Sequence, residues 1–184
     1  MRRVQLALAI GLAACGPSSG RDGLDGIDGE DGAPGAPGAP GTTGQEILEA
    51  VGDGQLQVSA ATNYTVIPGL AITTNVPANA KLHIDTNGGI QCTGVGSAYA
   101  VVDLAIFIDG SITFAQRRVV AANTDGLAQM IQSWSFGRSF ALTPGMHTID
   151  VRVQGVDPQA AVANVSSASA PQLQGVLTVT TLKL

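Results

Sequence analysis

The chain has few of the residues that catalysis, metal binding and disulfide formation require. Two cysteines and two histidines occur among 184 residues, and only 12% of the residues are charged. Neither an H-E-x-x-H motif nor a paired C-x-x-C motif is present. We therefore predict a protein that is not an enzyme and that uses no cofactor and no metal ion.

Long apolar runs are also missing, apart from one short run near the N-terminus. Arg2 and Arg3 precede a run of about eleven mostly apolar residues, Val4 to Ala14. This pattern is typical of a secretory signal peptide, and the run is shorter than the ~20 residues of a membrane-spanning helix. We expect residues 1–14 to be removed from the mature protein.

The apolar run ends in Leu12-Ala13-Ala14-Cys15, which resembles the lipobox of bacterial lipoproteins. The resemblance implies that Cys15 carries the lipid and that residues 15–19 form a lipidated tether. It also implies a location in the bacterial cell envelope, in the outer membrane and at the cell surface if the source is Gram-negative. An ordinary secretory signal is the alternative. With Cys15 acylated, Cys92 has no disulfide partner within the chain, and we expect it to be a buried small hydrophobe.

Residues 20–44 repeat glycine at every third position without a miss. The repeat predicts a collagen-like triple-helical stalk, because only glycine fits at the crowded axis of three wound chains. A Gly/Pro-rich disordered linker is the alternative, but such a linker needs no strict period. The expected axial glycines are Gly20, Gly23, Gly26, Gly29, Gly32, Gly35, Gly38, Gly41 and Gly44.

Charge is unevenly distributed along the chain. Eight of the fourteen acidic residues lie between Asp22 and Asp53, whereas six acids face six bases from Gly54 onward. A nearly neutral head without clustered lysine and arginine does not favour nucleic acid as a partner.

The pattern changes twice after the repeat. Strong helix formers in Gln45-Glu46-Ile47-Leu48-Glu49-Ala50-Val51 predict a short helical neck over 45–54, with an irregular linker as the alternative. From residue 55 to residue 184, β-rich runs alternate with turn signals. About ten strands fit this region, and they predict a β-sandwich or jelly-roll head. The clearest turn signals are Pro68-Gly69, Asn87-Gly88-Gly89, Asp109-Gly110 and Pro144-Gly145.

Several details of the head follow from local patterns. The runs on either side of Asp109-Gly110 predict a hairpin with a two-residue turn. In the run that begins at His147, alternation places His147, Ile149, Val151 and Val153 on one face. Thr180-Thr181 interrupts the alternation of the last run and suggests a bulge. We further expect Trp134, Phe136 and Phe140 to supply large core side chains, His83 and His147 to be packed or edge residues, and Arg117-Arg118 to be a solvated edge.

A Gly-X-Y stalk followed by a compact all-β head resembles the plan of the complement C1q and tumour-necrosis-factor superfamily, of bacterial collagen-like surface proteins and of phage fibre heads. The resemblance implies that the head forms a homotrimer. We expect a non-enzymatic, lipid-anchored surface protein whose partners are its own copies, the membrane through acylated Cys15, and an extracellular glycan or protein. A lectin-like head with one specific ligand and a prophage tail-fibre-like protein are the alternatives.

Overall fold

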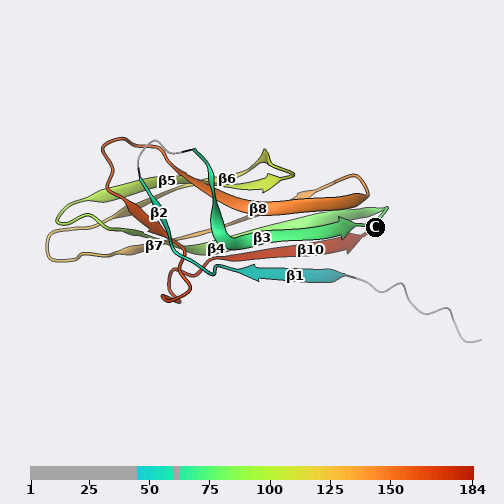
Figure 1. Ribbon diagram of the computed structural model, residues 1–184, viewed down its shortest axis with the longest axis horizontal. Helices are drawn as coiled ribbons and strands as arrows, with labels where there is room; N and C mark the ends of the chain where they lie inside the picture. The colour runs from blue at the N-terminus through green and yellow to red at the C-terminus, as the bar shows by residue number, and fades with distance from the viewer. Residues whose placement is uncertain (1–44, 60–62) are drawn as a thin grey trace, which may run out of the picture. The chain divides into compact units, whose positions relative to one another are not determined.

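The computed structural model describes residues 45–59 and 63–184, and this part of the chain is all-β (Figure 1). None of the described residues belongs to a helix with the length and apolarity needed to cross a bilayer. The predicted signal peptide, tether and Gly-X-Y stalk lie outside the described residues. The strands are β1 (Glu46–Val51), β2 (Leu56–Val58), β3 (Thr65–Val76), β4 (Ala80–Cys92), β5 (Tyr99–Ile108), β6 (Ser111–Ala122), β7 (Ile131–Phe140), β8 (Gly145–Gly155), β9 (Ala163–Val165) and β10 (Val176–Lys183).

The first sheet is built around β4, which is paired along both of its sides. Strand β7 pairs with residues 82–91 of β4 on one side. On the other side, residues 80–87 pair with β10 and residues 90–92 pair with β9. Strands β10 and β9 therefore lie in one row, and β1 and β2, which pair with them in turn, form the next row outward.

The second sheet has the order β3-β8-β5-β6 and lies over the first one (Figure 1). When β1 with β2, and β9 with β10, are each counted as one row, the head has eight rows. The first row pairs with the last, the second with the seventh, the third with the sixth and the fourth with the fifth, all antiparallel. This is the connectivity of a jelly roll, so the predicted fold class of the head is confirmed.

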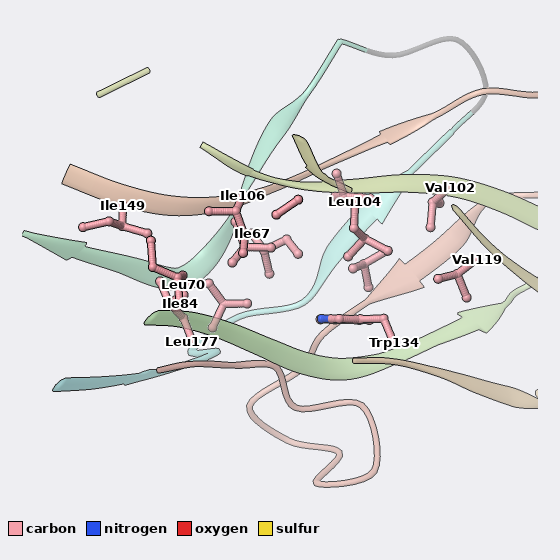
Figure 2. Close-up of a cluster of buried hydrophobic side chains, with 14 of the residues drawn as sticks. Ile67, Leu70, Ile84, Val102, Leu104, Ile106, Val119, Trp134, Ile149 and Leu177 are labelled. Carbon is pink, nitrogen blue, oxygen red and sulfur yellow. The ribbon is translucent and has the colours of Figure 1, made fainter. Parts of the chain in front are cut away.

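The core lies between the two sheets and is mainly aliphatic (Figure 2). Each strand contributes alternate side chains, as a half-buried strand must. Trp134 is the one large aromatic side chain that is fully buried among the described residues. Phe136 and Phe140 share its face of β7 but are only half-buried, because β7 is an edge strand.

Three local predictions for the second sheet are confirmed. Asp109 and Gly110 connect β5 to β6, and both have positive φ values, 51° and 76°, as a type I′ hairpin turn requires. Strand β8 alternates as expected, with Ile149, Val151 and Val153 fully buried. Arg117 and Arg118 lie on β6, the edge strand of this sheet, which agrees with the predicted edge position.

The predicted helical neck over 45–54 is wrong, because Glu46–Val51 forms strand β1. Every residue of β1 is paired with β10, from Glu46 opposite Thr181 to Val51 opposite Val176. Leu48 and Ala50 pack against the core, whereas Ile47 and Val51 face outward. Pairing with a distant strand and burial of one face therefore outweigh the local helix propensity of this segment.

The turn predicted at Asn87-Gly88-Gly89 is also wrong, because these residues lie inside β4. Glycine is needed there for space. A Cβ atom at Gly88 would collide with the ring of Trp134, and one at Gly89 would lie 2.7 Å from the carbonyl oxygen of Gln172. The two glycines let the indole and the segment 166–175 approach the strand.

The remaining differences concern irregularities in two strands. The bulge predicted at Thr180-Thr181 is absent, because β10 pairs in unbroken register and Thr181 occupies a core position with 2% exposure. Pro68-Gly69, read as a turn, instead lies in a register shift inside β3. Gly69 has a φ of 81° there, and the backbone N–H of Asp53 donates to the carbonyl of Pro68. This contact joins β3 to the segment after β1.

Candidate interaction surfaces

The two ends of the head carry different parts of the chain. The terminal end carries Gln45, where the described chain begins, and the C-terminal Leu184, whose backbone N–H donates to Asn79 at 2.7 Å. Glu46, Thr181 and Leu82 lie at the same level of the sheet, so the start of β1 and the C-terminus lie at the same end of the head (Figure 1). The opposite, distal end carries three loops, 93–98, 123–130 and 156–162, which we call the distal loops.

Asn123 holds two of the distal loops together. Its side chain is 3% exposed and donates from Nδ2 to the carbonyls of Cys92 and Gly94, at 3.3 and 2.8 Å. Its Oδ1 accepts from the backbone N–H of Met130 at 3.1 Å, and its own backbone N–H donates to Ala98 at 2.7 Å. A buried amide with every contact to backbone groups fixes the path of both loops.

The distal loops present apolar and acidic groups. Val95 is 89% exposed, Leu127 is 56% exposed and Met130 is 40% exposed. Asp125 and Asp157 add two carboxylates, and the three loops contain no lysine or arginine. Exposed apolar side chains on ordered loops are typical of a surface that contacts other molecules.

We predict that Asn123→Ala loosens the distal loops. The substitution leaves the backbone N–H of Met130 and the carbonyls of Cys92 and Gly94 without their side-chain partner, at a cost of about 1–3 kcal/mol in the free energy of unfolding. Urea unfolding should show this loss, and hydrogen exchange should accelerate in 93–98 and 124–130. Ser97→Ala is the matched control, because its hydroxyl makes only an exposed bond to Asp125. Equal exchange in the two variants would contradict the role of Asn123.

At the terminal end, an open cavity of about 640 Å³ lies between the edges of the two sheets. Gln45, Glu46 and Leu48 line it from the first sheet, and Asn75 and Met146 line it from the second. We call this cavity the terminal cleft. Its lining mixes apolar and hydrogen-bonding groups, and residues at the entry of the chain into the head form one of its walls.

At the terminal end, His147 makes hydrogen bonds to two of the connections between strands. Its Nδ1 lies 2.7 Å from Oδ2 of Asp109 in the β5–β6 turn, and its Nε2 lies 2.8 Å from the carbonyl oxygen of Thr143. Hydrogen bonds to Asp109 and Thr143 raise the pKa of His147. Bonds from the backbone N–H of Thr148 and from His147 lower the pKa of Asp109.

These shifts predict a pH window for stability. The contribution of His147 is full below its unfolded pKa of about 6.5 and is lost as pH rises through the folded pKa. The contribution of Asp109 is present above its unfolded pKa and is lost as pH falls through the folded value. Melting temperatures of the native chain and of His147→Gln should therefore differ most near pH 5 and converge in alkaline solution. A difference that grows above pH 8 would contradict this linkage.

The outer face of the second sheet carries a cluster of charges that neutralise one another. Arg152 donates from Nε and Nη2 to Asp150, at 2.6 and 3.0 Å, and its guanidinium lies 4.2 Å from the centroid of the Phe107 ring. The Tyr64 ring meets Phe107 edge to face at 5.2 Å, and burial raises the pKa of the Tyr64 hydroxyl. These arginine and aromatic side chains therefore make their contacts with one another within a single protomer.

On the outer face of the first sheet, a serine, a histidine and an aspartate form a row. His83 lies 2.9 Å from Ser139 Oγ through Nδ1 and 2.9 Å from Asp85 Oδ2 through Nε2. The row is exposed on a flat sheet, and none of its residues lines the described cavities. Strand β4 is paired on both sides, so its backbone N–H groups are not available to stabilise an oxyanion. The row is therefore suited to linking strand β4 to strand β7.

The residues that the sequence singles out are not brought into one site. Cys15 and the nine axial glycines lie outside the described residues. Cys92 is fully buried, as expected, and His83 and His147 lie on different sheets. In residues 45–59 and 63–184, no group of three or more His, Cys, Asp and Glu side chains is placed to hold a metal ion. The sequence analysis did not identify Asn123, because a polar residue in a loop is expected to be exposed.

No protein-family model matches the chain, and no curated protein is significantly similar to it in sequence. Among solved structures, it is similar to that of the infectious bursal disease virus Gx strain, with 13% identity and a TM-score of 0.41, over 82% of this chain and 42% of that one. It is also similar to the VP2 subviral particle of the same virus, with 15% identity and a TM-score of 0.39, over 75% and 37%. The chain thus spans less than half the length of these capsid chains.

Proposed function

We propose that this protein is a non-enzymatic, lipid-anchored trimer of the bacterial cell envelope, in which a collagen-like rod displays a jelly-roll head. The observation that best supports this function is the separation of the two ends of the head. Gln45, which follows the Gly-X-Y repeat directly, lies at the terminal end with Leu184, and the ordered distal loops lie at the other end. A chain that enters at one end leaves the opposite loops free for contact.

The mechanism of such a protein is geometric. Eight triplets at ~3.1 Å per residue form a rod of roughly 75 Å, which holds the heads away from the envelope. The three heads share one rod, so a weak contact by one head raises the effective concentration of the other two at the same target. Adhesion then depends on multivalency more than on the affinity of a single site.

The anchor gives a direct test of one part of this function. Cys15→Ala should abolish incorporation of labelled palmitate and should move the protein from the membrane fraction to the soluble secreted or periplasmic fraction. The thiol is the group that accepts the lipid, and the buried Cys92 cannot replace it. Cys92→Ala is therefore the matched control and should retain the label. Membrane retention of Cys15→Ala would contradict lipidation at this residue.

The stalk gives the second test. The chain from residue 16 to residue 184 should sediment as a trimer and show a positive circular dichroism band near 220 nm that melts cooperatively. Gly32→Ala places a methyl group at the crowded axis and should lower the melting temperature of this band. Ala33→Ser, at the neighbouring outward position, should leave the band and its melting temperature nearly unchanged. A monomer without the band would contradict the trimeric rod.

A lectin-like head is the second candidate function. Tyr99 is 37% exposed at the base of the distal loops, and its hydroxyl donates to Asp157 at 2.9 Å. This hydrogen bond is the main cause of the raised pKa of Tyr99. An amphipathic ring beside a carboxylate offers both an apolar face and hydrogen-bonding groups to a sugar. Specific retention of the native chain on a glycan array would favour this function over contact with a protein.

A further inference from the structure

We infer that the three heads close around the β1–β3 edge, so that Ile47 of one protomer packs against Met146 of the next. This inference rests on the trimer of the proposed function and identifies the surface that forms it. The partner is a second copy of this chain, and the contact lies at the terminal end, beside the terminal cleft.

The place where the repeat ends indicates which part of each head lies nearest to the other copies. Gly44, the last glycine of the repeat, is followed directly by Gln45, and β1 begins at the next residue. Three wound chains share one axis, so three copies of Gln45 begin side by side. Gln45 and Glu46 line the terminal cleft between β1 and β3. In the proposed trimer, the β1–β3 edge is therefore the part of each head that lies nearest to the other copies.

Exposed apolar side chains flank this edge on both outer faces of the sandwich. Ile47 is 65% exposed and Val51 is 42% exposed, and both lie on the outer face of the first sheet. Met146 is 65% exposed and pairs with Asn75 on the outer face of the second sheet. Within one protomer these groups point away from each other, so they cannot cover one another.

A threefold ring makes such faces meet. A cyclic trimer uses two unlike patches on every protomer, because its interface is heterologous. If the shared edge of each sandwich points to the axis, the first sheet of one protomer faces the second sheet of its neighbour. Ile47 then lies opposite Met146, whose flexible thioether adapts to an irregular apolar surface. Burial of these groups supplies the attraction that a short stalk lacks.

The same geometry leaves another apolar group outside the ring. Phe114 is 89% exposed on β6, which is the edge strand farthest from β3 in the second sheet. It therefore lies on the side of the head away from the axis. This position makes Phe114 a matched control, since it is as apolar and as exposed as the proposed contact residues.

Cross-linking of paired cysteines in the full chain tests the inference. Ile47→Cys with Met146→Cys, treated with a bismaleimide too short to reach around the β1–β3 edge, should yield covalent dimers and trimers. Ile47→Cys with Phe114→Cys should remain monomeric on a denaturing gel. Acylated Cys15 and buried Cys92 do not compete for the reagent. A trimer that links through the Phe114 pair, or through neither pair, would overturn the inference.

Substitution by glutamate gives an independent measurement. Met146→Glu should raise the dissociation constant of the trimer by roughly tenfold or more, because the interface would bury an unpaired carboxylate. Phe114→Glu should leave the constant unchanged. Sedimentation of the native chain distinguishes a failure of the proposed trimer from a failure of the proposed interface. A native monomer would overturn the trimeric function and this inference together, whereas a native trimer insensitive to Met146→Glu would overturn the inference alone.

Discussion

The antiparallel pairing of the last strand, β10, with both β1 and β4 is the constraint on which the rest of the head depends. Residues 176–181 of β10 pair with the first strand on one side, and residues 176–183 pair with β4 on the other. This double pairing closes the jelly roll, places the first described residue beside the last, and orients Leu177 and Val179 into the core. It also places the end of β10 at the terminal end of the head, whereas its partner β4 runs from there to the distal loop 93–98. A change that frees β10 would disturb the fold and the display of those loops together.

The interruption between β9 and β10 has a second consequence for the core. The segment 166–175 leaves the row of strands and returns to it, and the N–H of Gly89 and the carbonyl of Leu173 bond across the gap. The space above Gly88 admits the indole of Trp134, whose Nε1 donates to Thr86 Oγ1 at 3.3 Å. The position of the Trp134 indole therefore depends on the missing side chain at Gly88, and the approach of the segment 166–175 depends on the missing side chain at Gly89. This arrangement explains how a chain with few aromatic residues fills a core that is otherwise aliphatic.

Much of this fold was predictable where the signal is local. The Asp109-Gly110 turn, the alternation after His147 and the shared face of Trp134 and Phe136 each depend on a few neighbouring residues, and the structure confirms them. The wrong predictions concern segments whose pairing partners lie far away in the sequence. The segment 45–51 has the composition of a helix. It forms a strand because it pairs with β10, which lies more than 120 positions away in the sequence. The contact surfaces were not predictable either, because the outer faces of β1 and β8 become neighbours of the same edge only after the jelly roll has closed.

The strand at Glu46–Val51 also changes where a trimer would have to be stabilised. A helical neck could have gathered three chains as a short bundle, separately from the head. Because this segment belongs to the sheet, no such bundle stands between Gly44 and the sandwich. The Gly-X-Y repeat has four aspartates in succession at one of its positions, so three copies held side by side would repel one another in its first half. A trimer of this chain would therefore need attraction from the head, where a single protomer leaves apolar groups such as Ile47 and Met146 exposed.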